Sequence, residues 1–351
     1  MKRFDYIRPA SIDEALAAWN PGAAWLGGGT NLVDLMKTGA VQPDTVIDVT
    51  RLPGLDRIEW GADGSLRIGA MVRNADLADD PEVARRLPMV AEALLAGASG
   101  QLRNAATVGG NLMQHTRCNY FETPQAACNR RDPGTGCDAR DGENANLAVL
   151  GWSEACIATN PSDFCVPLAA LDAVVEVQGP EGKREIAIAD FHSLPGDTPE
   201  RRTALEPGEL ILAVRLPAAA ADFAGHARYL KVRERTSYAF ALVSAAAALR
   251  MEGDRIAEAR LALGAVAAKP WRVAEAEALL AGQAPDPHLF ARAAGAALTG
   301  AAPSGDNSWK IDLARRTAAR ALAMAATGAP ARMPALPASP FGEPAGDHVH
   351  A

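Results

Sequence analysis

The first 220 residues alternate short apolar runs with turn-forming residues, which predicts short strands and helices. Ser11 and Glu14 form a capping box, so a helix is expected to run from there to about Trp19. Thr30 and Gly39 are suitably placed to begin and end a second helix. A longer helix is predicted over 81–96. Strands are predicted over 23–26, 46–49, 57–60, 66–69, 173–177, 185–188 and 210–216.

From about residue 224 the apolar pattern lengthens. Three longer strands are predicted over 227–233, 240–250 and 256–266, joined by tight turns such as the one at Gly253, and helices over 271–281, 287–299 and 309–326. This indicates a separate C-terminal α+β domain, residues 223–327, with a three-stranded antiparallel sheet. The segment 328–351 contains five prolines and no apolar period. We expect it to be disordered or to lie over a partner.

Composition excludes several classes of protein. The 351 residues are 48% hydrophobic and 22% charged, with a net charge of -7, and no basic block indicates nucleic-acid binding. No apolar run approaches the roughly 20 residues of a membrane span. The N-terminal residues MKRFDYIRPA lack the apolar core of a signal peptide. Any export is therefore expected to depend on a partner.

Two glycine-rich segments are candidates for binding an anion. Gly27, Gly28 and Gly29 follow a predicted strand, where glycine permits positive φ and close approach of the backbone to a ligand. The second segment, 100–111, offers a hydroxyl at Thr107 and close backbone approach at Gly110. Neither the Rossmann nor the Walker spacing fits. Two such segments suit a pyrophosphate, whereas each one alone would also fit a simple tight turn.

All five cysteines lie between residues 118 and 165. Cys118, Cys128, Cys137 and Cys156 have the spacing C-x9-C-x8-C-x18-C, which lacks the close pairs of zinc ribbons and the spacing of bacterial ferredoxins. Wide spacing suits a loop around a larger object such as a [4Fe-4S] cluster. Zinc, disulfides and free thiols remain alternatives. Neighbouring arginines could offset the charge of such a cluster: Arg117, Arg130, Arg131 and Arg140. Cys165 adjoins an apolar helix and is expected to be buried and inert.

Taken together, these segments resemble a known family. The segment from Leu26 to Leu32 resembles the first FAD loop of the medium, flavoprotein subunits of the xanthine dehydrogenase and carbon monoxide dehydrogenase family of molybdenum hydroxylases. The segment from Arg103 to Leu112 resembles the second FAD loop. Residues 114–157 look like an insertion similar to that of the FAD subunit of bacterial periplasmic aldehyde oxidoreductases, which holds a [4Fe-4S] cluster. Further matching segments are 97–104, 153–159 and 237–244.

The resemblance implies a fold and a set of site residues. The fold would be α+β, with a two-part vanillyl-alcohol-oxidase (PCMH-type) FAD-binding domain over 1–222, followed by the C-terminal domain. The first loop would hold the FAD pyrophosphate, and the residues implied there are Trp25, Leu26, Gly27, Gly28, Gly29, Thr30, Asn31, Leu32 and Val33. Other contacts to FAD are implied for Thr107, Gly110, Asp163, Ile211 and Lys231. The [4Fe-4S] ligands implied are Cys118, Cys128, Cys137 and Cys156.

The implied function is electron transfer within a heterotrimer, without catalytic residues in this chain. A large partner with a molybdenum cofactor would oxidise an aldehyde, and a small partner would pass electrons through two [2Fe-2S] clusters to FAD and on to an external acceptor. The iron–sulfur cluster would act as an interface staple or a side store of electrons. Co-export with a signal-bearing partner would place the complex in the periplasm; otherwise it would be cytoplasmic. A zinc-stabilised nucleotide-binding scaffold and a stand-alone flavin oxidase are the rival hypotheses.

Overall fold

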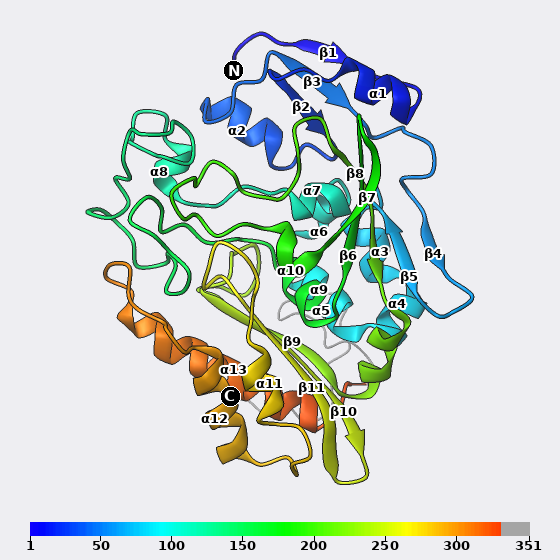
Figure 1. Cartoon of the computed structure of the whole chain (residues 1–351), viewed down its shortest axis with the longest axis vertical. Coiled ribbons are helices and arrows are strands. Elements are labelled where there is room, and N and C mark those ends of the chain that lie inside the picture. Colours follow the sequence, from blue (N-terminus) through cyan, green and yellow to red (C-terminus); the bar gives the residue numbers. More distant parts are fainter. Residues whose placement is uncertain (331–351) are drawn as a thin grey trace.

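The computed structural model describes residues 1–330, so the predicted proline-rich tail falls almost wholly outside the described residues. The chain begins with a small parallel sheet of strand order β1-β3-β2, at the top of Figure 1. Its strands are β1 (Asp5–Ile7), β2 (Ala23–Leu26) and β3 (Thr45–Asp48). Two helices, α1 (Ile12–Ala18) and α2 (Leu32–Thr38), connect these strands. None of the helices among residues 1–330 combines the length and apolarity needed to cross a membrane.

A five-stranded antiparallel sheet forms the second part of the N-terminal region. Its order is β4-β5-β8-β6-β7, so β8, from much later in the chain, lies between the earlier β5 and β6. The strands are β4 (Ile58–Trp60), β5 (Leu66–Gly69), β6 (Val174–Gly179), β7 (Gly182–Ala187) and β8 (Leu210–Leu216). Short helices accompany this sheet: α3 (Asn74–Asp79), α4 (Pro81–Arg86), α5 (Pro88–Ala96), α6 (Gly100–Arg103), α7 (Val108–Leu112), α9 (Cys165–Ala170) and α10 (Ile188–Phe191).

The C-terminal region contains a third sheet, with strand order β12-β11-β10-β9. Its strands are β9 (Ala227–Val232), β10 (Val243–Glu252), β11 (Arg255–Gly264) and β12 (Trp271–Arg272), preceded by the 3-10 helix η1 (Ala218–His226). The predicted three-stranded sheet therefore has a fourth strand. Residues Trp271 and Arg272 pair with β11 instead of starting a helix. The helices are α11 (Ala274–Ala278), α12 (Pro287–Ala297) and α13 (Ser308–Ala326).

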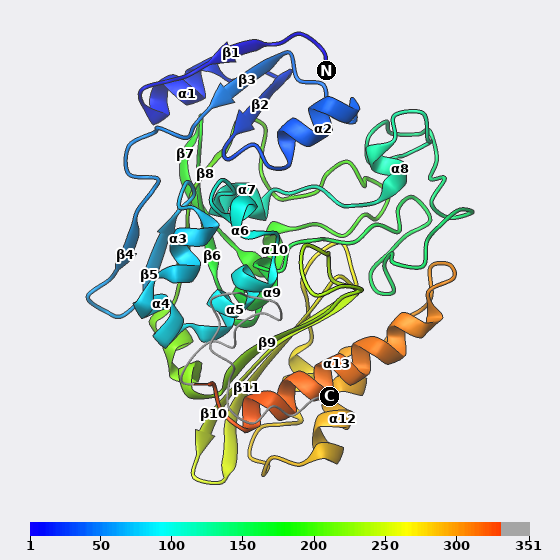
Figure 2. The same ribbon diagram turned by 180° about the vertical axis from the view of Figure 1, so that it is seen from behind.

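Strand β10 joins the two hydrophobic cores because successive side chains point to opposite faces of a sheet. Ala246 and Ala248 pack into the core of the N-terminal region. Ala245, Ala247 and Leu249 pack into the second core, beneath α12 and α13. Small side chains on both faces let the sheet lie close to its neighbours on each side. Figure 2 shows α13 running along this sheet.

Local signals explain the helix ends. Ser11 accepts a hydrogen bond from the Glu14 N–H at 3.2 Å, and Gly39 ends α2 with a φ of +84°, both as predicted. The predicted helix over 81–96 is instead two helices. Leu87 leaves the helical conformation (φ -134°, ψ 53°) because it precedes Pro88, which begins α5.

The predicted insertion, residues 114–157, is mostly loop, with one short helix α8 (Asn119–Glu122). In Figures 1 and 2 it lies beside the beginning of α13. Two side chains just before α13 and one in its first turn hold the later part of the insertion. Ser304, Asn307 and Lys310 donate hydrogen bonds to the backbone carbonyls of residues 146–148. These bonds fix the later part of the insertion to the C-terminal region of the chain.

Candidate cofactor pocket and cysteine cavity

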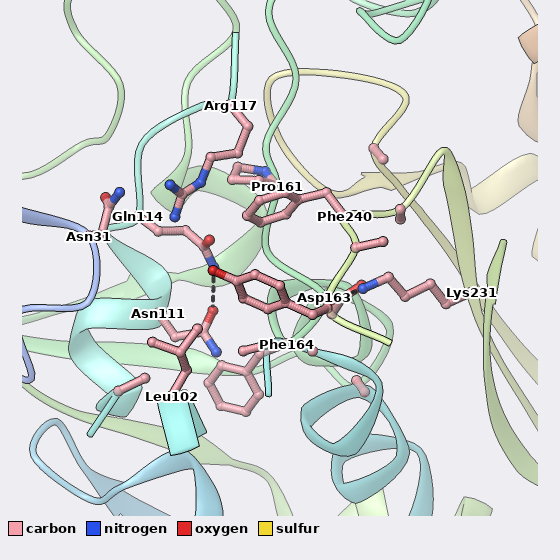
Figure 3. A pocket seen from close by; sticks show the side chains of 18 of the residues that line it. Asn31, Leu102, Asn111, Gln114, Arg117, Pro161, Asp163, Phe164, Lys231 and Phe240 are labelled. Atoms are coloured by element: carbon pink, nitrogen blue, oxygen red, sulfur yellow. Dashed lines mark hydrogen bonds and ion pairs between the residues drawn. The ribbon is translucent and has the colours of Figure 1, made fainter. Parts of the chain in front are cut away.

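A cavity of about 550 Å³ lies between the two glycine-rich segments, the insertion and the loop between β9 and β10. Its volume is typical of small-molecule and cofactor sites. Figure 3 shows Asn31 and Gln114 on one side of this cofactor pocket and Lys231 on the other. The cavity thus draws its walls from both regions of the chain.

The first glycine-rich segment packs directly on the second. A Cβ at Gly28 would lie 1.8 Å from the carbonyl oxygen of Ala105, and one at Gly27 would lie 2.7 Å from Thr107 Oγ1. Only Gly29 has a positive φ, +75°. Gly27 and Gly28 therefore allow the two segments to pack together, and the positive φ that the sequence suggested is found at Gly29.

The second segment contains two short helices, α6 and α7, joined by residues 104–107. Thr107 precedes α7, and its hydroxyl accepts a hydrogen bond from the Gly110 N–H at 3.3 Å. A Cβ at Gly109 would approach the carbonyl oxygen of Ala70 to 3.1 Å, so this position too allows close packing. Thr107 consequently serves as a helix cap, and Gly110 lies at the pocket wall.

Unpaired polar atoms show that the pocket suits a polar ligand. Asn31 Nδ2 and Asn74 Oδ1 are buried and have no hydrogen-bond partner, and both residues line the cavity. Asn31 Oδ1 accepts from the His115 N–H at 2.8 Å, which fixes the direction of the amide. Asn31, and not Thr30, is the residue that precedes α2. Because buried polar groups are normally satisfied, these atoms fit a ligand such as a dinucleotide.

Asp163 and Lys231 form a buried ion pair at the pocket wall. Lys231 Nζ donates to Asp163 Oδ2 at 2.8 Å, and its side chain is only 3% exposed. The Tyr229 hydroxyl donates to Asp163 Oδ1 at 2.6 Å. Burial, followed by the Asp163 charge, raises the pKa of Tyr229 well above its ordinary value. Lys231 also donates to the carbonyl of Ala96 at 3.1 Å, so the cation is held in place.

Five of the predicted cofactor residues line the cavity: Thr30, Asn31, Gly110, Asp163 and Lys231. The others are not among the residues that line it: Trp25, Leu26, Gly27, Gly28, Gly29, Leu32, Val33, Thr107 and Ile211. Trp25 Nε1 donates to the carbonyl of Glu209, and Ile211 is buried in the core of the N-terminal region. The role of each in holding a cofactor stays a prediction.

Sequence reasoning missed several lining residues. Gln114 donates to Asn111 Oδ1 at 2.6 Å, and the Arg117 guanidinium lies 4.8 Å from the ring centroid of Phe240. The half-buried guanidinium of Arg103 donates to the carbonyl of Gly97 at 2.8 Å. Burial lowers the pKa of Arg103. Phe240 lies in one of the segments used to recognise the family, which is the one signal that could have indicated it.

The four predicted metal ligands line one small cavity. Cys118, Cys128, Cys137 and Cys156 all face it, although up to 18 residues separate neighbours in the sequence. An isolated antiparallel bridge pairs Cys128 with Cys137. All are free thiols, so the disulfide alternative is not realised here. We call this space the cysteine cavity.

The thiols of the cysteine cavity influence one another. Burial, with smaller repulsion from Cys128 and Cys156, raises the pKa of Cys118 to about 11. Thiolates at this position therefore need a compensating positive charge. Among residues 1–330, no group of three or more His, Cys, Asp or Glu side chains is arranged to hold a metal ion, so a cluster at the four cysteines that line this cavity stays a prediction. Cys165 lies elsewhere, and burial raises its pKa to about 12, which agrees with an inert thiol.

Arg131 organises the loop around the cysteine cavity. Its Nη1 donates to the carbonyls of Tyr120, Phe121 and Thr123 at 2.9 Å each. Its Nη2 donates to the carbonyls of Pro124 and Ala126. Arg131 was predicted to offset charge at a cluster. In the structure it satisfies backbone carbonyls, a role that the planar guanidinium suits, and its effect on a cluster stays a prediction.

Two comparisons with known proteins identify the family. Residues 2–219 match the FAD binding domain in molybdopterin dehydrogenase, and residues 228–326 match the CO dehydrogenase flavoprotein C-terminal domain. The chain is 51% identical to the aldehyde oxidoreductase FAD-binding subunit PaoB of Escherichia coli, over 93% of this chain and 99% of that one. It is 29% identical to the carbon monoxide dehydrogenase medium chain of Afipia carboxidovorans, over 94% and 97%.

Solved structures agree. Reconstituted CO dehydrogenase from Oligotropha carboxidovorans superimposes with a TM-score of 0.74 at 27% identity, covering 93% of this chain and 99% of that one. The carbon monoxide dehydrogenase of Hydrogenophaga pseudoflava gives a TM-score of 0.72 at 29% identity, over 92% and 97%. The chain therefore belongs to the family of FAD-binding medium subunits of the xanthine dehydrogenase and carbon monoxide dehydrogenase type.

Proposed function

We propose that this chain is the FAD-binding, electron-transferring subunit of a molybdenum-dependent aldehyde oxidoreductase. The observation that carries the proposal is its 51% identity to PaoB, an aldehyde oxidoreductase subunit, over nearly the whole of both chains. Relatives named as medium chains or subunits imply a large and a small partner. The aldehyde would be oxidised in the large, molybdenum-containing partner. The small partner would deliver electrons through two [2Fe-2S] clusters.

The residues at the cofactor pocket fit FAD. FAD when bound supplies a centre that accepts electrons and passes them to an external acceptor. The unpaired amides of Asn31 and Asn74 would bind its polar groups, and Gly110 would allow close backbone approach. The fixed ammonium of Lys231 would stabilise negative charge in the pocket, while Asp163 keeps that ammonium in position.

The cysteine cavity supports the second cofactor of the proposal, a [4Fe-4S] cluster. Four thiols from distant points of one insertion converge on a single cavity. Cys118, Cys128, Cys137 and Cys156 would be its ligands. Two residues that line the cavity also carry buried polar atoms without a partner, Thr116 Oγ1 and Arg130 Nε, and these fit an anionic group. This cluster would stabilise a subunit interface as a staple or act as a side store of electrons.

Spectroscopy and metal analysis test this proposal. The purified chain is expected to show flavin absorption bands and to contain iron with acid-labile sulfide. Zinc without sulfide would support the scaffold hypothesis instead, and absence of both flavin and iron would exclude the proposal. The Cys118→Ser variant is expected to lose iron but retain flavin, because the cysteine cavity and the cofactor pocket are lined by different residues.

Two further experiments test whether the chain needs its partners for activity and where the complex is located. Aldehyde oxidation is expected only when the partners are present, and activity of the isolated chain would instead indicate a stand-alone oxidase. We also propose that the complex lies in the periplasm. This chain would reach that compartment by co-export with a signal-bearing partner. Cell fractionation with and without that partner tests the location: a chain that stays in the cytoplasm in both cases would contradict co-export.

A further inference from the structure

The cysteine cavity contains two polar side chains that have no partner. Thr116 is 3% exposed, and its hydroxyl makes no hydrogen bond. Arg130 Nε is buried and equally unpaired. Both residues line the cavity together with the four cysteines. Leaving such a group unsatisfied costs about 1–3 kcal/mol, and more for a charged one, so two in one small cavity require an explanation.

Arg130 also lacks a counter-charge, so the missing partner is expected to be negatively charged. Among the described residues, no carboxylate lies within ion-pair distance of Arg130 or of the neighbouring Arg202. Arg202 donates instead to the carbonyl of Met113 at 3.1 Å. Burial and the Arg130 charge lower the pKa of Arg202 to about 10. The two guanidinium groups repel each other, and a negative charge bound beside Arg130 would relieve this repulsion.

Each of the other arginines of the insertion has a carboxylate partner or several carbonyl acceptors, although Arg117 Nε and Arg140 Nη1, like Arg130 Nε, make no hydrogen bond. Arg131 is held by backbone carbonyls, Arg117 lies 3.5 Å from Glu122, and Arg140 lies 2.8 Å from Glu154. Arg130 is thus the arginine of the insertion that faces the cysteine cavity without a counter-charge. Thr116 supplies a neutral hydrogen-bond donor to the same cavity. A site with four sulfur ligands, one unpaired cation and one unpaired hydroxyl suits a cluster with net negative charge.

We propose that Arg130 and Thr116 tune the reduction potential of the cluster bound by the four cysteines. This inference rests on the proposed function, because it needs the cluster to be present. One-electron reduction adds one negative charge to the cluster. A fixed cation and a hydroxyl donor stabilise the more negative state, and hydrogen bonds to sulfur and nearby charge are known to set cluster potentials. Both residues would therefore raise the potential. They act through the cluster environment and are not ligands.

The test is a redox titration of the full chain, followed by electron paramagnetic resonance, with iron and sulfide measured on the same samples. The Arg130→Gln variant is expected to retain iron and to have a lower midpoint potential. We expect roughly a tenfold change in the ratio of reduced to oxidised cluster at fixed potential, or about 59 mV for a one-electron couple. Thr116→Val should shift the potential in the same direction by a smaller amount.

Two variants serve as controls. Arg130→Lys keeps the charge and should keep the potential close to that of the original chain. Arg140→Gln removes the same charge from the same insertion, but Arg140 does not line the cysteine cavity, so the potential should not change. If Arg130→Gln loses iron while Arg130→Lys retains it, the charge is needed to hold an anionic cluster, which supports the inference.

The outcomes separate this inference from the proposed function. A chain without iron would overturn both. If all variants contain iron, and Arg130→Gln, Thr116→Val and Arg140→Gln have the same midpoint potential, the tuning role is overturned. The proposed function is not affected by that result. If both Arg130 variants lose iron, Thr116→Val decides: an unchanged midpoint overturns the inference, and a lower midpoint supports it.

Discussion

At the scale of single residues, Gly28 shows how one side chain decides whether the cofactor pocket can form. Gly28→Ala would place a methyl group 1.8 Å from the Ala105 carbonyl oxygen, and rigid backbone cannot yield to it. We expect destabilisation of about 1–3 kcal/mol or more, together with loss of bound flavin. Thermal unfolding and flavin content measure this. Gly100→Ala is the matched control, because a Cβ there meets nothing within 4 Å; equal effects of the two changes would contradict the argument.

The buried pair of Lys231 and Asp163 makes a second prediction at this scale. Lys231→Met removes the cation and leaves the carboxylate with only the Tyr229 hydroxyl as a side-chain partner. Breaking a buried pair costs about 3–5 kcal/mol, so stability in urea should fall by that order. The double variant Lys231→Met/Asp163→Asn should lose less than the sum of the single changes. Additive losses would mean that the two groups are not coupled.

At the scale of elements, the insertion depends on Arg131. Arg131→Gln would leave several backbone carbonyls between residues 120 and 126 without a donor, at about 1–3 kcal/mol for each one that stays buried. The loop around the cysteine cavity should then open, while the rest of the chain keeps its fold. Limited proteolysis with mass spectrometry should detect faster cleavage within 114–157. Arg140→Gln should be cleaved like the unchanged chain, and a resistant Arg131→Gln loop would contradict this role.

The elements also show how far sequence alone could reach. The capping box at Ser11, the stop at Gly39 and the alternating strands were predictable because each signal acts within a few residues. The break at Pro88 was visible in the sequence but was outweighed by the apolar pattern of 81–96. The strand at Trp271 depends on pairing with β11, so local preference for a helix was overridden by the sheet.

At the scale of the whole molecule, residues 146–148 form a wall shared by three parts of the structure. Asn146 and Leu147 line the cofactor pocket, and Leu147 also packs with the cysteines. The C-terminal region holds their carbonyls through Lys310 and Asn307. Clustering of the cysteines predicted their convergence. No sequence signal marked this contact, because it joins residues more than 150 positions apart that carry no motif.

Lys310 should make the stability of the molecule depend on pH. It is 0% exposed, donates to the carbonyls of Asn146 at 2.7 Å and Leu147 at 3.0 Å, and has no carboxylate among its ion pairs or hydrogen bonds in the described chain. Burial lowers its pKa from 10.5 to about 7. Between these values the unfolded chain binds more protons than the folded chain, so the free energy of unfolding should rise with pH across this window.

Urea unfolding at several pH values between 7 and 10 measures this effect. Relative to Lys310→Met, the unchanged chain should gain up to about 1.4 kcal/mol per pH unit as the amine becomes neutral in the folded state. Lys269→Met is the matched control, since that ammonium also donates to a carbonyl but is exposed. Its stability should follow the pH dependence of the unchanged chain. Parallel curves for Lys310→Met and the unchanged chain would show that Lys310 stays charged in the folded protein, and that its carbonyl partners suffice to hold the ammonium.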